Sequence, residues 1–167
     1  MIIRTSLLGI IVIAASTAAQ GTDAAVKGLR SEWGMTANFL RTAVEQMPEA
    51  DFTYRPVASV RTFGELIKHI TATQLVLCGV ALGEKTMTDG VETPSTRKAD
   101  LAKELQESME YCAKAYAQDL SKLPLEPSQR EQRYYVLAHN TAHNGEHYGN
   151  IATYMRMKGL VPPSSQR

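Results

Sequence analysis

The chain has 167 residues, of which 44% are hydrophobic and 21% are charged. This length and composition are typical of one globular domain with a hydrophobic core of its own. Its 18 basic residues against 17 acidic ones leave a formal net charge of +1. Because no basic stripe with interleaved aromatic residues interrupts this balance, a nucleic-acid partner is not expected.

The N-terminus has the pattern of a secretory signal peptide. The basic start MIIR precedes the apolar stretch SLLGIIVIAAS, and TAAQG supplies small residues for cleavage after Ala18 or Ala19. The apolar run is shorter than the ~20 residues of a transmembrane span, which makes an uncleaved anchor the less favoured alternative. We therefore expect a signal peptide at 1–19 and a domain at 20–167. The mature protein would be exported, to the periplasm or outside, and would not be attached to a membrane.

The first half of the mature chain predicts two helices. Apolar residues at spacings of three, four and seven predict the first helix over 23–47, which ends before Pro48. A loop with two prolines and two aromatic residues follows at 48–60. The second helix is expected over 62–83, because Thr62 and Glu65 have the spacing of a capping box and Gly83 is a suitable C-terminal stop.

The second half predicts two more helices, at 95–120 and 128–159, separated by SKLPLEP. No strand-like alternation competes with them, so the expected fold is an all-α four-helix bundle. The polar connection at 83–95 can extend about 40 Å at ~3.3 Å per residue. It is therefore long enough to run back along a helix, although its length alone does not require a crossover.

Three of the four histidines lie in HNTAHNGEHYGN, as His139, His143 and His147. Residues four apart lie on one helix face, so neighbouring imidazoles of this set can bind one metal ion at about 2.0–2.1 Å. His139 and His147 are separated by about 12 Å of helix rise at 1.5 Å per residue, too far to share that ion. A third ligand must come from elsewhere, and His69 is the candidate.

Helix geometry favours the pair His143 and His147 over the pair that includes His139. His69 follows the predicted start of its helix by about seven residues, and His147 precedes the predicted end of its helix by about eleven. If the two helices are antiparallel, these histidines lie at similar depth from one end of the bundle. His139 lies deeper in the bundle. If the two helices were parallel, His69 would lie far from His143 and His147.

The end of the chain, HNGEHYGN…YMRMKGLVPPSS, resembles the terminal motif of the DinB-like (DinB/YfiT-like) metalloenzyme family. In that motif a His-x-x-x-His pair, here His143 and His147, precedes a small residue and a Tyr/Leu-x-Arg-x-x-Gly ending. The matching residues of that ending are Gly149, Tyr154, Arg156 and Gly159. The stretch FGELIKHI resembles the family's other signature, a histidine early in the second helix, and supplies His69.

This resemblance implies an up-down-down-up bundle with a long crossover between the second and third helices. It also implies a divalent metal, zinc or nickel, on His69, His143 and His147, with open positions for water or a small-molecule substrate of unknown identity. A homodimer is implied by the resemblance alone. No catalytic residue is assigned.

The chemistry expected of such a site is that of a metal-dependent hydrolase or a thiol transferase. Characterised relatives include transferases and isomerases that use low-molecular-weight thiols, whose cosubstrates are cytosolic. Export therefore favours hydrolysis by metal-activated water, which needs no such cosubstrate. The alternatives are a non-catalytic metal-binding protein and a structural helical bundle whose histidines are incidental.

Two residues near the proposed ligands have more than one interpretation. HNGEH also matches the inverted zinc-protease motif, but no acidic ligand follows Glu146. Glu146 is either solvent-facing or a hydrogen-bonding partner of a ligand histidine, and His139 is either a structural residue or an accessory proton carrier. Tyr54 and Arg55 are candidates for lining the open end of the bundle.

Two cysteines, Cys78 and Cys112, complete the set of reactive side chains. Cys78 follows His69 by nine residues and therefore points away from the proposed metal. If the second and third helices are parallel, the two thiols lie level, and a disulfide is feasible once their Cα atoms come within about 7 Å. Two unpaired thiols are the preferred interpretation.

Overall fold

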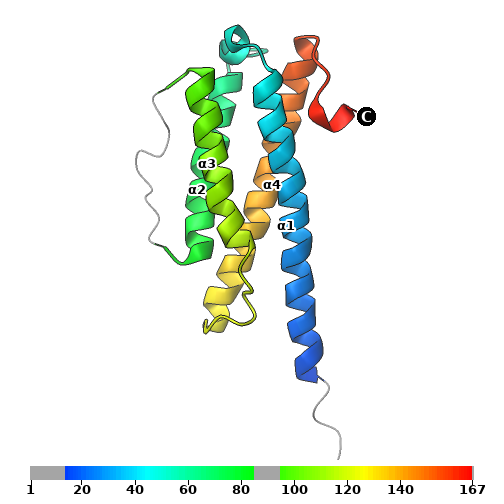
Figure 1. Ribbon diagram of the computed structural model, residues 1–167, viewed down its shortest axis with the longest axis vertical. Coiled ribbons are helices and arrows are strands. Elements are labelled where there is room, and N and C mark those ends of the chain that lie inside the picture. The colour runs from blue at the N-terminus through cyan, green and yellow to red at the C-terminus, as the bar shows by residue number, and fades with distance from the viewer. Residues whose placement is uncertain (1–13, 85–94, 167) are drawn as a thin grey trace, which may run out of the picture.

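The computed structural model describes residues 14–84 and 95–166, which form an all-α bundle without strands (Figure 1). Its four long helices are α1 (Ala14–Gln46), α2 (Phe63–Leu82), α3 (Lys98–Tyr116) and α4 (Pro127–Met157). Two short 3-10 helices are η1 (Glu49–Thr53), after α1, and η2 (Pro163–Ser165), near the C-terminus. The predicted all-α four-helix bundle is confirmed.

Local sequence signals set the ends of α2 and α4. Thr62 caps α2 through the expected box, in which its hydroxyl accepts from the Glu65 N–H and the Glu65 carboxylate accepts from the Thr62 N–H. Gly83 and Gly159 adopt the left-handed conformation, at φ 81° and 76°. The following N–H at each end bonds to a carbonyl five residues back, which is a Schellman motif.

Two helices differ from the predicted ranges. The first begins at Ala14 instead of residue 23, because the alanine-rich stretch AASTAAQ has high helix propensity. It thus includes the end of the predicted signal peptide, whose residues 1–13 lie outside the described residues. The third helix ends at Tyr116, earlier than the predicted 120. There the Asp119 carboxylate accepts hydrogen bonds from the backbone and hydroxyl of Ser121 and forms a turn in place of another helical turn.

The helices are arranged up, down, down and up, as the family resemblance implied (Figure 1). Helix α2 packs against α3 and α4, and α1 packs against the same two helices. The parallel pair α2 and α3 needs a connection that returns along the bundle, and residues 85–94 of this crossover lie outside the described residues. Helices α2 and α4 are antiparallel neighbours, which is the arrangement that the histidine argument requires.

The core fills the space between all four helices. Fully buried side chains come from each of them, among them Leu40, Ile67, Ile70, Leu101, Leu105, Leu137 and Ile151. Among the described residues, α2 alone is long and apolar enough to cross a membrane, with a mean hydropathy of 1.3. Half of that stretch is buried inside the bundle, as expected of a core helix.

A buried glutamine at the centre of this core contacts every other helix. The Gln74 Oε1 atom on α2 accepts from Trp33 Nε1 on α1 at 3.0 Å and from Asn144 Nδ2 on α4 at 2.9 Å. Its Nε2 atom donates to the Ser108 hydroxyl on α3 at 2.7 Å. All four helices are therefore joined through one amide, which has a relative exposure of 0%.

Cys78 and Cys112 form a disulfide between α2 and α3, with their Cα atoms 5.2 Å apart. The preference for unpaired thiols was therefore wrong. The parallel course of the two helices puts the thiols level, and both side chains are fully buried. The bond closes a loop with a sequence separation of 34 that contains the crossover.

We expect no free thiol in the unreduced, denatured protein and two after reduction, by thiol titration. Reduction should lower the free energy of unfolding by about 3–4 kcal/mol, because a bond across 34 residues restricts the unfolded chain. Urea unfolding with and without a reductant measures this loss. A Cys78→Ala, Cys112→Ala double variant should not respond to the reductant, and two thiols before reduction would contradict the pairing.

Replacing Gln74 with leucine should destabilise the bundle by about 2–4 kcal/mol, because the Trp33 N–H and the Asn144 amide would lose their buried acceptor. Chemical unfolding measures the change. The matched control is Gln106→Leu on α3, whose amide is exposed and, among the described residues, bonds only to Glu110. It should change the stability by less than about 0.5 kcal/mol. Equal effects of the two substitutions would refute a central role for Gln74.

Candidate metal centre

Two of the predicted ligands lie one turn apart on α4. The face of this helix that points into the bundle carries Asn140, Asn144, His147 and Ile151, at spacings of four, three and four. His147 is buried, with a relative exposure of 9%, and His143 is half-buried at the edge of this face. The helix thus holds both imidazoles between the core and solvent.

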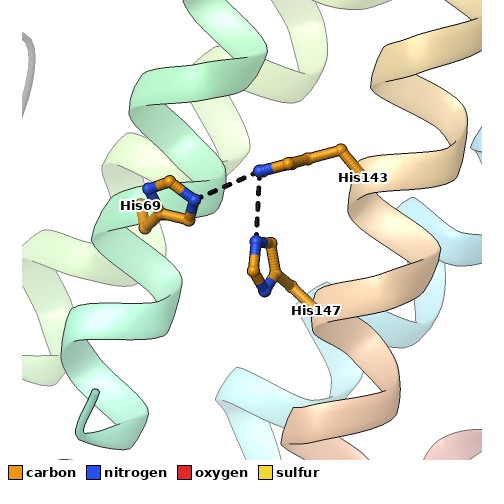
Figure 2. A group of neighbouring side chains, drawn as sticks. All are labelled: His69, His143 and His147. Atoms are coloured by element: carbon orange, nitrogen blue, oxygen red, sulfur yellow. Dashed lines mark hydrogen bonds between the residues drawn. The ribbon is translucent and has the colours of Figure 1, made fainter. Parts of the chain in front are cut away.

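The third predicted ligand reaches them from α2. His69 extends across the gap between the antiparallel helices, so that nitrogens of all three rings converge (Figure 2). The His143 Nε2 atom is 3.1 Å from His69 Nε2 and 3.1 Å from His147 Nε2. The structure therefore brings His69, His143 and His147 together, as the depth argument predicted.

The spacing of these nitrogens fits a single ion. Two ligands at 2.0–2.1 Å from a tetrahedral metal are about 3.3 Å apart. The two distances of 3.1 Å are close to that value, and ligand atoms of all three histidines lie within 4.8 Å of one another.

Burial favours the neutral form of the two α4 histidines. Burial, and after it the neighbouring His147, lower the pKa of His143 from 6.5 to about 4. The pKa of His147 is also lowered, first by burial and then by the charge of His69. Because a metal ion binds only the unprotonated imidazole, the lowered pKa values of His143 and His147 favour metal binding near neutral pH.

The outward nitrogens of the α4 histidines have different surroundings. The His147 Nδ1 atom lies 3.4 Å from the Asn150 side-chain amide. An Nε2-bound histidine carries its proton on Nδ1, so the Asn150 oxygen would accept it after an amide flip. The His143 Nδ1 atom is buried without a hydrogen-bond partner among the described residues.

The two residues predicted as supports of the ligands lie at the surface. The His139 ring is exposed and parallel to Tyr135, with centroids 5.9 Å apart, and its centroid is 6.2 Å from that of His143. Glu146 is exposed, and its negative charge opposes the lowering of the pKa of both His143 and His147. Their proposed roles in hydrogen bonding or proton transfer stay predictions.

A cavity of about 700 Å³ opens beside His147. The loop before α2 lines one side of it through Arg55 and Arg61, and α4 lines the other through Asn150 and Tyr154. Arg55 therefore lies where the sequence analysis placed it. Tyr54 is not among the lining residues; its ring packs edge-on against that of Tyr154, with centroids 6.0 Å apart.

Sequence reasoning missed the polar residues behind and beside the histidines. Asn144 and Gln74 form the buried layer next to the cluster. Both are polar residues on the otherwise apolar inward faces of α4 and α2, and this pattern could have predicted them from the sequence. Asn150 and Arg61 adjoin His147 at the cavity. Arg61 gave no signal, because only the packing of the loop against α4 brings it near a histidine 86 positions away in the chain.

The sequence was compared with models of known protein families. The family model of the DinB superfamily matches residues 32–151. The chain belongs to the DinB superfamily. The match runs from α1 into α4 and includes all three clustered histidines, so this DinB-superfamily domain carries its metal-compatible cluster within the family region. Among curated proteins, none matches the chain.

The stability of the metal-free protein should fall as the pH decreases from about 6.5 to about 4. In this window the unfolded chain protonates His143, whereas the folded chain does not until the pH nears 4. Since the unfolded state then binds more protons, the free energy of unfolding rises with pH and levels off for this group above 6.5. Urea unfolding in the presence of a chelator at several pH values measures the slope.

A His143→Gln variant should have a smaller pH slope than the parent in this window. His139→Ala, at the exposed ring, serves as the control and should keep most of the slope, because the charge of His139 is one of the lesser causes that lower the pKa of His143. An identical slope in all three proteins would show that His143 titrates normally in the fold.

Proposed function

We propose that this protein is an exported, metal-dependent enzyme that binds one divalent ion, zinc or nickel, through His69, His143 and His147. The observation that carries the proposal is the convergence of these imidazoles from two antiparallel helices, at 3.1 Å between their Nε2 atoms. Membership of the DinB superfamily supports it, since the matched region contains all three residues.

The donor set favours zinc or nickel over the hard cations. Imidazole nitrogen suits zinc, copper, iron and nickel, whereas magnesium and calcium prefer oxygen. Three protein ligands leave a coordination position open, which is the pattern of catalytic and not of structural zinc sites. When bound, such an ion supplies Lewis acidity, which lowers the pKa of water, polarises a carbonyl group or activates a thiolate.

The chain's own residues determine where a substrate would approach. His147 forms part of the wall of the 700 Å³ cavity, so the open side of the cluster faces a space of small-molecule size. Gln74 and Asn144 close the opposite side with buried, mutually bonded amides. The substrate is therefore expected to enter through the cavity, between the loop before α2 and the C-terminal part of α4 that carries Asn150 and Tyr154.

Export favours hydrolysis over thiol transfer, because water needs no cytosolic cosubstrate. The signal-peptide pattern of residues 1–19 supports export. The disulfide between Cys78 and Cys112 also supports it, because such bonds persist in oxidising compartments and are rare in the cytosol. A thiol transferase is the alternative chemistry at the same ion.

The mature protein, purified without added metal or a histidine tag, should contain about one zinc or nickel ion per chain. Elemental analysis measures the stoichiometry. Alanine at His69, His143 or His147 should weaken binding by more than about 100-fold, since loss of an outer hydrogen-bonding partner alone typically costs 10–100-fold.

The matched control for these variants is His139→Ala, which removes an exposed histidine from the same helix and should retain the ion. A protein that binds no zinc or nickel even after incubation with either would overturn the proposal. In a metal-loaded protein, turnover of ester, amide and thiol-addition substrates that is lost in His147→Ala would separate an enzyme from a metal-binding protein.

A further inference from the structure

The cavity beside His147 is lined by more positive than negative charge. Arg55 and Arg61 face it from the loop before α2, and Glu65 is the one carboxylate among its lining residues. The remaining polar lining residues are Ser59, His147, Asn150 and Tyr154. At about 700 Å³ the space exceeds what a single ion requires and suits a small organic molecule.

The carboxylate of Glu65 is already engaged elsewhere. It accepts a hydrogen bond from the Thr62 backbone N–H at 2.7 Å as part of the capping box of α2. This bond is the largest cause of the lowered pKa of Glu65, and the positive charges of Arg55 and Lys68 lower that pKa further. Glu65 therefore stabilises the helix end in its ionised form, and the two arginines leave the cavity with an excess of one positive charge.

Arg61 is held in place by its backbone and not by its side chain. The Tyr154 hydroxyl donates to the Arg61 carbonyl at 2.9 Å, which fixes this part of the loop against α4. Within residues 14–84 and 95–166, no side chain forms a hydrogen bond or ion pair with the Arg61 guanidinium. Its five N–H donors are thus available to a ligand in the cavity.

Arg55 faces the same space with donors to spare. One of its terminal nitrogens donates to the Ala58 carbonyl at 3.4 Å, which bends the loop around the side chain. The other donors of its guanidinium are not used by this contact. Two guanidinium groups, each with a planar fork of donors, present the geometry that matches the paired oxygens of a carboxylate or phosphate.

We propose that this cavity binds the oxyanion group, carboxylate or phosphate, of a small organic acid through Arg61 and Arg55. The rest of the molecule would extend along the wall formed by Asn150 toward His147. The role of this acid as a substrate rests on the proposed metal-dependent function. The binding of its oxyanion does not, because the arginines belong to the loop and not to the histidine cluster.

The test is an NMR titration of the ¹⁵N-labelled, metal-free protein with three probes: succinate, inorganic phosphate and neutral succinamide. The side-chain Nε–H signal of Arg61 and the backbone amides of 58–61 should shift and saturate with succinate, phosphate or both. Dissociation constants of about 1 mM are expected for such fragments. Response to one anion alone identifies which oxyanion the site prefers, and succinamide should cause no saturable shift.

Two substitutions of Arg61 separate charge from geometry. Arg61→Gln should weaken binding of the preferred anion by about tenfold or more, and Arg61→Lys, which keeps the charge without the fork, should have an intermediate effect. The matched control is Arg30→Gln, which removes the same charge from the exposed surface of α1 and should leave the affinity unchanged. Retained dispersion of the amide spectrum verifies that each variant is folded.

The proposal is overturned if neither anion gives a saturable shift, if succinamide shifts the same signals equally, or if Arg30→Gln and Arg61→Gln weaken binding to the same extent. Because the titration contains no metal, its failure leaves the metal site standing, and absence of metal binding leaves the oxyanion site standing. Repeating it with zinc present should tighten binding of the anion if the bound molecule extends to the ion; unchanged affinity would contradict that part of the proposal.

Discussion

The hydrogen bonds of one buried amide fix how the four helices are aligned along their axes. Gln74 is the only residue for which the described contacts include a side-chain hydrogen bond to each of the other three helices, through Trp33, Ser108 and Asn144. A slip of any helix by one turn would move a partner by about 5.4 Å and leave a polar group buried without a bond. Apolar packing alone tolerates such shifts more readily than these directional contacts do.

The position of the histidine cluster follows from this alignment. Asn144 bonds to Gln74 and immediately follows His143 in α4, while His69 precedes Gln74 by little more than one turn in α2. The contact that orients the amides therefore also sets His69 opposite His143 and His147. Burial at this depth lowers the pKa of both α4 histidines, which suits metal binding, whereas an empty cluster gains little stability from three clustered rings.

The disulfide and the cavity lie in different parts of the bundle. The disulfide between Cys78 and Cys112 joins the parallel helices α2 and α3, which no short turn can connect. The pair α2 and α4 instead meets the loop before α2 at the end of the bundle where the cavity lies. The proposed ligands thus come from rigid helices, and the proposed oxyanion donors come from the loop, where sequence can change without disturbing the core.

The sequence by itself determined the features that depend on neighbours in the chain. The four helices, the capping box at Thr62 and the stop at Gly83 follow from local geometry. Helix rise alone showed that His139 and His147 cannot share an ion, whereas the choice of His143 with His147 also required antiparallel helices. The predicted boundaries failed where a local turn or alanine-rich stretch competed with the apolar pattern.

Only the tertiary structure decided which distant residues meet. The distance from His69 to the α4 pair, the disulfide, the bonds of Gln74 and the approach of Arg61 to His147 depend on how the helices pack and on where the loop crosses α4. Helix periodicity shows which way a side chain faces. It does not show what lies opposite, because the rotation and depth of each helix are set by contacts that form together across the whole core.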